Sequence, residues 1–164
     1  MIPRKNHEVI IRALGKIKDP KVYYFIAGDG ELKMELKNLI NTLKLEKNIF
    51  LLGYRTDIRQ LCNSSDIFAM PSIHEGLSVA LMEAMGCGKA IIGSKIRGNV
   101  DLIKQGKGGY LCPTDNIDMY VRAIEKLAIS SRRRKKFGSY NQKVVKEFDI
   151  IPVKKQLMQI IEEN

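Results

Sequence analysis

Two glutamates, Glu75 and Glu83, are the side chains of this sequence whose types and spacing most clearly suggest chemistry. Glu83 is the only charged residue in the run SVALMEAMGCG at positions 78–88, and the apolar residues around it predict a helix that is buried on nearly all sides. Because a buried carboxylate needs a partner, we expect Glu83 to face a polar ligand in a groove. The competing interpretation is that Glu83 pairs with a buried lysine or arginine and that Glu75 is a solvated loop acid.

Glu75 belongs to the segment PSIHEGLS, whose proline, glycine and serine residues predict a loop that leads into the N-terminus of the Glu83 helix. If the whole stretch were helical, a rise of roughly 1.5 Å per residue would place the two carboxylates at most about 12 Å apart, with free N–H groups of the helix N-terminus between them. Two acids that bind hydroxyl groups, on either side of amides that bind an anion, suit a nucleotide sugar. Paired carboxylates also serve glycoside hydrolysis, but the neighbouring phosphate-binding loops favour nucleotide binding.

Other loops contain residues that suit the same ligand. The glycine loop at 28–30 follows a strand and begins a helix, so its backbone can approach a phosphate closely, although Lys33 stands where the dinucleotide fingerprint has its third glycine. Each candidate also has an ordinary structural interpretation, such as a tight turn, a solvated cation or a half-buried ring. The candidates are Arg4 and Lys5 for a diphosphate, Gly28 and Gly30 for phosphate, Tyr54 for a base, and His74 and Arg97 for sugar or phosphate.

The order of apolar patterns predicts an α/β protein with a Rossmann-like parallel sheet and helices on both faces. In such sheets ligands bind beyond the carboxyl ends of the strands, where all the candidate loops fall. The sequence begins with a basic loop and a helix, so we expect a further strand upstream. We expect strands at 22–27, 48–52, 67–70, 90–93 and 110–111, a turn at 108–109, and helices at 10–17, 32–43, 58–62, 78–88, 99–104, 117–127, 137–148 and 152–164.

Length and composition predict one ordinary globular domain. The chain has 164 residues, of which 45% are hydrophobic and 28% are charged. It has neither a membrane-spanning stretch nor a signal peptide, so we expect a cytoplasmic protein. The three cysteines are widely spaced and predict reduced core residues rather than disulfides, and the two histidines lack the spacing of a zinc site, so no metal is expected.

The formal net charge of +10 is compatible with nucleic acid, an anionic membrane surface or phosphorylated small molecules as partners. The densest basic cluster spans residues 132–136. We interpret it first as a solvated helix face and next as a membrane-surface contact. Nucleic acid binding is the weakest reading, because no aromatic residues interleave with the cluster and no binding motif is present.

Several spaced segments together resemble the carboxyl-terminal, donor-binding half of the family 4 retaining GT-B glycosyltransferases, also called glycosyl transferases group 1. The most specific element is E-G-x-x-x-x-x-x-E-A-M at 75–85, and IRGNVDLI resembles enzymes of exopolysaccharide and capsule assembly. The resemblance implies that residues 1–164 are one half of a GT-B fold. It also implies that a first strand and an amino-terminal acceptor domain are absent, and that the helix at 152–164 packs toward that domain. The segments are RKNHEVIIRAL, FIAGDGEL, IFLLGY, DIFAMPS, EGLSVALMEAMGCGKAII and GYLCP.

The resemblance assigns roles to individual residues. It implies that Glu83 bonds the ribose hydroxyls, that Glu75 lies at the donor hexose, and that Lys5 meets the diphosphate, so that Glu75 and Lys5 carry catalysis. Ser78 and Asp101 depart from the pattern, because family members commonly have glycine and glutamate there. The remaining donor-binding positions are Arg4, Gly28, Gly30, Tyr54, His74, Gly76, Leu77 and Ser78.

The implied activity is transfer of a hexosyl group, with retention and without a cofactor, from a nucleoside diphosphate sugar to a glycan or lipid-linked acceptor. The resemblance favours a UDP sugar, with the enzyme in the cytoplasm or at the inner face of the membrane. We expect the isolated chain to bind nucleotide weakly and to transfer little or no sugar. Three alternatives stay open: a subunit of a split glycosyltransferase, half of a nucleotide-sugar epimerase, and a basic non-enzymatic module that binds nucleic acid or membrane.

Overall fold

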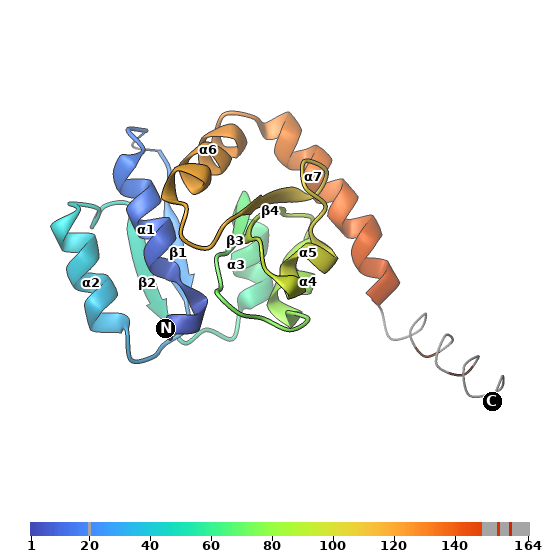
Figure 1. Cartoon of the computed structure of the whole chain (residues 1–164), viewed down its shortest axis with the longest axis horizontal. Helices are drawn as coiled ribbons and strands as arrows, with labels where there is room; N and C mark the ends of the chain where they lie inside the picture. Colours follow the sequence, from blue (N-terminus) through green and yellow to red (C-terminus); the bar gives the residue numbers. More distant parts are fainter. Residues whose placement is uncertain (20, 149–153, 155–157, 159–164) are drawn as a thin grey trace.

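The computed structural model describes residues 1–19, 21–148, 154 and 158, and helices flank its strands (Figure 1). The strands are β1 (Tyr24–Ala27), β2 (Ile49–Gly53), β3 (Ile67–Met70), β4 (Ala90–Ser94) and β5 (Gly109–Cys112). The α-helices are α1 (His7–Lys16), α2 (Lys33–Thr42), α3 (Ile58–Ser64), α4 (Val79–Gly86), α5 (Arg97–Leu102), α6 (Ile117–Ala128) and α7 (Ser131–Val144). Two 3-10 helices complete the set, η1 (Pro3–Lys5) and η2 (Val145–Phe148).

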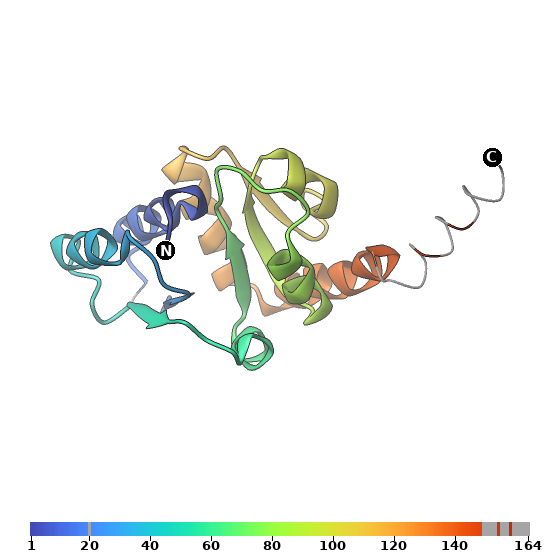
Figure 2. The same ribbon diagram turned by 90° about the horizontal axis from the view of Figure 1, so that it is seen from below.

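The strands pair in two parallel ladders. In the first, β1 pairs with β2, with Ile26 opposite Leu51; in the second, the order is β3-β4-β5, with Ile92 opposite Tyr110. The α/β class with parallel strands flanked by helices is therefore confirmed, although one face of the first ladder is open, where Phe25 is 55% and Phe50 is 38% exposed. Among the described strands, however, β1 and β3 do not pair with each other, so the backbone pairing is interrupted where a single sheet was expected (Figure 2).

Side-chain packing continues across this interruption on one face. Helices α1, α2 and α6 place apolar residues at helical spacing against the strands, and α1 and α6 pack on each other. Their core includes Ile26 and Ile49 from the first ladder and Ala90 and Ile92 from the second, together with the fully buried Tyr120. The two ladders therefore share one hydrophobic core.

The opposite face of the second ladder carries a separate core. It is formed by α3, α4 and α5 around Met70 and Ile91, with Leu81 and Met85 from α4. Strand β4 is buried along its whole length because it contributes alternate residues to the two cores. The end of β4 is therefore held rigidly, and the loop that follows β3 lies beside it.

Most of the expected elements are present, with shifted ends. Helix α5 begins two residues before the expected position 99. The expected turn at 108–109 is wrong for Gly109, which belongs to strand β5. Gly109 lies directly against the Ile91 carbonyl of the neighbouring strand, where a Cβ has no room. Helix α7 begins at Ser131, since the Ser130 hydroxyl caps it by accepting a hydrogen bond from the Arg133 amide. The expected helix at 152–164 lies outside the described residues, apart from 154 and 158.

The three cysteines are free, as the sequence predicts. Cys62 and Cys112 are buried, whereas Cys87 is only partly buried at the end of α4. Among the described residues, no helix combines the length and the apolar content needed to cross a bilayer.

Candidate functional site at the carboxyl ends of the strands

The loops that follow β1, β2 and β3 meet at one end of the molecule, where the N-terminus also lies (Figure 1). The Met1 carbonyl accepts a hydrogen bond from Leu32, just beyond β1, and the Arg4 carbonyl accepts one from Ile73, just beyond β3, at 2.8 Å. The segment 1–5 therefore connects the carboxyl ends of the two ladders. Ligands of open α/β sheets bind at this end of the strands.

An ion pair joins two of the predicted residues. Lys5, the last residue of η1, places its Nζ atom 2.7 Å from Oε1 of Glu75 in the loop after β3. The Glu75 side chain is only 10% exposed, whereas that of Lys5 is 33% exposed. The interpretation of Glu75 as a solvated loop acid is therefore wrong, because the carboxylate is largely buried against a cation.

The charge state of Glu75 follows from this environment. Burial by itself would raise the pKa of the Glu75 carboxyl, but hydrogen bonds from Lys5 and Ser72 and the positive charges of Lys5 and Arg4 outweigh it. The pKa consequently lies below the usual value, and Glu75 is an anion at neutral pH. An ionised carboxylate held in place can orient a sugar or stabilise positive charge that develops near it.

Glu83 lies in a different environment from the one expected. Helix α4 buries Leu81, Ala84 and Met85 but exposes Val79, Glu83 and Gly86, which recur at helical spacing on one side. The expectation of a helix buried on nearly all sides is therefore wrong, because the helix rests on the core with one face only. Among the described residues, Glu83 forms no ion pair, so its carboxylate is free to accept hydrogen bonds from a ligand.

The loop between β3 and α4 is fixed from two sides. Its Ile73 amide binds the η1 backbone, as described above, and its Gly76 carbonyl lies directly against Gly98 of α5, where any Cβ would overlap the carbonyl oxygen. Ser78 ends the loop as the N-cap of α4, with its hydroxyl 3.4 Å from the Leu81 amide. The backbone that carries Glu75 is therefore held by η1, α5 and the start of α4.

A buried polar network lies under the same loop, and the sequence did not reveal it. The Asn99 side-chain amide donates to the Met70 carbonyl at 3.3 Å and to the Ser94 carbonyl at 3.0 Å, and the Ser94 hydroxyl donates to the Ser72 carbonyl. Asn99, Ser94 and Ser72 are fully buried. These bonds join the carboxyl ends of β3 and β4, and a lone asparagine in a short helix gives no sequence signal for such a role.

The glycine loops after β1 and β2 form the other side of the site. The Gly28 amide donates to the Gly53 carbonyl at 2.7 Å, so the two loops lie together. Gly30 has φ of +149° and lies against the Met1 backbone, which leaves no room for a Cβ. Tyr54 extends from the second loop, and 81% of its surface is exposed. Its ring is therefore available to pack against a ligand.

The remaining predicted residues lie at this end of the strands but form no hydrogen bond or ion pair with the side chains of Lys5 and Glu75, on which Arg4 acts only through its charge. Arg4, His74, Gly76 and Leu77 are exposed in the two segments that carry Lys5 and Glu75, and Arg97 is exposed at the start of α5. Leu77 is 53% and Val79 is 64% exposed. The rim of the site therefore contains apolar side chains as well as polar ones.

A cavity of about 450 Å³ lies between α1 and α2, next to this site. Ile2, Pro3, His7 and Ile73 are among its lining residues, and Glu75 and Glu83 are not. The His7 Nδ1 atom is 2.9 Å from the Tyr24 hydroxyl; burial, followed by the charges of the N-terminus and Lys5, lowers the pKa of His7 from 6.5 to about 4. His7 is therefore neutral at pH 7, and the positive charge near the site comes from Arg4, Lys5 and the amino terminus.

Taken together, the site offers an anchored carboxylate–lysine pair, a second and unpaired carboxylate, and glycine backbone at the end of β1. Amides and a lysine can bind phosphate, and carboxylates can bind hydroxyl groups. Among the described residues, no cluster of three or more histidine, cysteine or acidic side chains is placed to hold a metal ion. The arrangement suits a ligand with both anionic and hydroxyl-rich parts.

Comparison with known proteins points in the same direction. A family model described as glycosyl transferases group 1 matches residues 1–144. The UDP-Gal:alpha-D-GlcNAc-diphosphoundecaprenol alpha-1,3-galactosyltransferase of Escherichia coli is 34% identical over 133 residues, which cover 80% of this chain and 34% of that protein.

Solved structures show the same arrangement of elements. HepE of Anabaena in complex with UDP is similar with a TM-score of 0.92 and 26% identity, over 99% of this chain and 46% of that one. The same protein in complex with UDP-glucose gives a TM-score of 0.90 and 27% identity, over 100% and 47%. The chain thus spans between a third and a half of the length of these relatives.

Proposed function

Because this chain belongs to the glycosyl transferases group 1 family, we propose that residues 1–164 form the unit that binds the nucleotide sugar donor in a hexosyl transfer reaction. The whole reaction takes place in an enzyme whose acceptor-binding part lies outside this chain. The observation that carries the proposal is the Lys5–Glu75 ion pair at the carboxyl ends of the strands, with the unpaired Glu83 on the helix that follows.

UDP is the nucleotide of the proposed donor. The solved structures of HepE contain UDP and UDP-glucose. Glu83 accepts hydrogen bonds from the ribose hydroxyls, because its carboxylate is exposed and has no ion-pair partner among the described residues. The exposed Tyr54 ring packs against the base.

The diphosphate binds between Lys5 and the backbone amides of the loop that contains Gly28 and Gly30. When the bond between sugar and diphosphate breaks, negative charge accumulates on the departing phosphate. A lysine and oriented amides that are already in place stabilise this charge without reorganisation. Catalysis by this half of the enzyme is thus electrostatic and is provided by the chain's own groups.

Glu75 orients the hexose and stabilises the positive charge that develops on it as the leaving group departs. The Lys5 ammonium group, 2.7 Å away, favours the ionised form of the Glu75 carboxyl and holds the side chain in place. Retention of anomeric configuration belongs to this proposal. The acceptor is a glycan or lipid-linked saccharide of a cell-surface polysaccharide.

Calorimetric titration with UDP tests the proposal, with Glu83→Ala as the variant. Removing a charge-assisted acceptor should cost about 1 to 3 kcal/mol of binding free energy. Glu125→Ala, an exposed acid on α6, is the matched control and should leave the affinity unchanged. Equal affinity of the wild type and Glu83→Ala would remove Glu83 from the donor site.

Product analysis with UDP-glucose and the whole enzyme separates the reaction classes. A transferase releases UDP only when an acceptor takes the sugar or water replaces it, whereas an epimerase returns an isomerised UDP sugar without an acceptor. We expect UDP release that depends on acceptor.

A further inference from the structure

The positive charge of the chain is concentrated at the end of the molecule opposite the candidate site. Loops that precede parallel strands lie at the amino ends of those strands. The loops before β1, β2 and β5 each carry two exposed lysines, which have no ion-pair partner among the described residues. These lysines are Lys18 and Lys21, Lys44 and Lys47, and Lys104 and Lys107.

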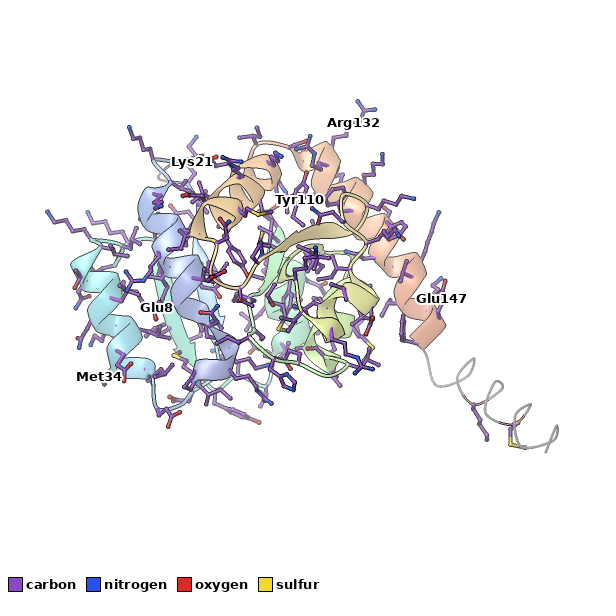
Figure 3. All side chains as sticks on the ribbon, viewed as in Figure 1. Glu8, Lys21, Met34, Tyr110, Arg132 and Glu147 are labelled. Carbon is purple, nitrogen blue, oxygen red and sulfur yellow. The ribbon has the colours of Figure 1, made fainter. Side chains whose placement is uncertain are left out.

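Helix α7 adds the densest cluster of charge to the same end. The helix follows α6, whose last turn lies at the amino ends of the strands, because Arg134 reaches both the Ala128 carbonyl at 2.8 Å and Asp66, the residue before β3, at 3.2 Å. Figure 3 shows Arg132 and Lys21 at the same end of the molecule, while Met34 near the start of α2 lies at the other. We call the loops before β1, β2 and β5 and the first two turns of α7 the basic end.

The basic residues of α7 divide into two groups. Arg133 and Arg134 serve the fold, since their guanidinium groups donate to carbonyls at the end of α6. Arg132, Lys135 and Lys136 are exposed and have no such contact. Because a helix N-terminus carries partial positive charge, cations in these turns oppose the macrodipole and do not stabilise the helix. Local features that cost stability are characteristic of functional surfaces.

An exposed isoleucine lies within this cluster. Ile129, in the turn between α6 and α7, has 82% of its surface exposed, more than any other large hydrophobic residue of the described chain. The loops of the basic end contain two exposed acids, Asp19 and Glu46, against six exposed lysines, and the neighbouring Asp66 is paired with Arg134. An aliphatic tip surrounded by lysine and arginine matches the boundary of an anionic bilayer, where apolar groups enter and cations meet headgroups.

We propose that the basic end is a docking surface for an anionic membrane, with Ile129 inserted at the headgroup boundary and Arg132, Lys135 and Lys136 on the lipid phosphates. Docking in this way requires no spanning helix, and none is present among the described residues. It also leaves the opposite end of the strands in water, where a soluble nucleotide sugar reaches it. An aliphatic tip gains nothing from stacking on bases, so lipid fits this surface better than nucleic acid does.

Flotation with vesicles tests the proposal on the purified chain. The probes are vesicles of equal parts phosphatidylcholine and phosphatidylglycerol, compared with phosphatidylcholine alone. We expect the chain to bind the anionic vesicles at low ionic strength, to dissociate at high ionic strength, and to ignore neutral vesicles. Equal binding to both kinds of vesicle would overturn the proposal.

A charge-matched pair of variants locates the surface. Arg132→Glu with Lys135→Glu should reduce binding to anionic vesicles by at least about tenfold, since basic residues near such a surface each contribute several-fold. Lys37→Glu with Arg59→Glu changes the net charge equally at exposed positions on α2 and α3 and should change binding by less than about twofold. Equal loss in both double variants would mean that only net charge matters, which contradicts a localised surface.

Three further measurements separate this proposal from its alternatives and from the donor site. Ile129→Asn should weaken vesicle binding while leaving its salt dependence unchanged, and no loss would exclude insertion. Duplex DNA that binds more tightly than the vesicles would identify the basic end as a nucleic acid surface instead. Calorimetric titration with UDP should give the same affinity for the Arg132→Glu, Lys135→Glu variant as for the wild type, so the membrane result does not depend on the donor site.

Discussion

At the scale of single residues, the Lys5–Glu75 ion pair connects η1 to the loop after β3. Its carboxylate is 10% exposed, so the interaction is screened less by water than the surface pairs of the chain are. Removing one partner of such a pair leaves the other charge poorly solvated. The pair should therefore contribute to stability as well as to donor binding.

Lys5→Met should lower the free energy of unfolding at neutral pH by about 1 to 3 kcal/mol, because Glu75 then lacks its principal donor. Lys33→Met is the control, since Lys33 at the start of α2 pairs at 3.0 Å with Asp29 of the preceding loop, and such exposed pairs contribute less than about 1 kcal/mol. Urea denaturation of the three proteins measures the difference. Similar losses in both variants would show that the burial of Glu75 has no energetic consequence.

The partly buried His7 predicts an acid-sensitive fold. Its pKa is lowered from 6.5 to about 4, so the unfolded chain binds a proton on His7 over a range of pH in which the folded chain does not. The stability linked to His7 is complete above pH 6.5 and is lost as the pH falls toward 4, by up to about 3 kcal/mol. Glu75, whose pKa is also lowered, adds a loss that begins as the pH falls through the usual carboxyl range and continues below it.

Denaturation of the wild type and of His7→Gln between pH 7 and pH 4 tests this expectation. The glutamine retains a polar group near the Tyr24 hydroxyl but does not titrate. The stability of His7→Gln should therefore depend less on pH across this interval. Parallel curves for the two proteins would contradict the assignment of the acid sensitivity to His7.

Candidate site residues could be chosen from the sequence where they stand in a recognisable pattern. Glu75 and Glu83 follow from spacing around an apolar run, and Lys5 follows from the family resemblance. Asn99 could not be predicted, because its importance comes from carbonyls of Met70 and Ser94 that only the fold brings together. The exposure of Glu83 was also hidden, since composition alone does not reveal which face of α4 meets the core.

At the scale of elements, α5 supports the loop that carries Glu75. Gly98 lies so close to the Gly76 carbonyl that a side chain must displace the loop. Strand β3 has the predicted ends and α4 begins with the predicted cap region, because apolar runs and a serine cap are local signals. The contact between Gly98 and Gly76 is not local, so no pattern along the chain predicts it.

Gly98→Ala should therefore destabilise the fold by about 2 kcal/mol or more, as overpacking typically does, and should weaken UDP binding through the displaced loop. Gly86→Ala is the matched control: its added Cβ meets nothing within 4 Å at the end of α4, so it should be neutral or stabilising by about 0.5 to 1 kcal/mol. Thermal denaturation and UDP titration of both variants provide the measurements. A neutral Gly98→Ala would show that the loop moves without cost.

At the scale of the whole molecule, two ladders share one core although their backbones do not pair. The alternation of strands and helices predicted the α/β class. The interruption between β1 and β3 could not be predicted, because the residues of a strand do not specify which other strand it pairs with. Packing of α1 against α6 carries the connection instead. The carboxyl ends of both ladders nevertheless meet at one site through residues 1–5.

This site is open on the side away from the strands. Tyr54 is 81%, Val79 is 64% and Leu77 is 53% exposed, so a bound donor would remain in contact with water. Electrostatic stabilisation of a leaving diphosphate is strongest where water is excluded, and transfer also requires an acceptor held in line with the donor. The described residues line one side of the proposed donor site and provide no second wall.

We therefore expect the isolated 164-residue chain to bind UDP measurably and to transfer no sugar from UDP-glucose. Incubation with UDP-glucose and a panel of lipid-linked and soluble glycans, followed by mass spectrometry of the products, measures transfer. Calorimetric titration of the same preparation with UDP confirms that the protein is folded and that the donor site is intact. Robust transfer by this chain alone would mean that the groups around Glu75 and Lys5 suffice for catalysis, which contradicts the requirement for a second wall over the donor.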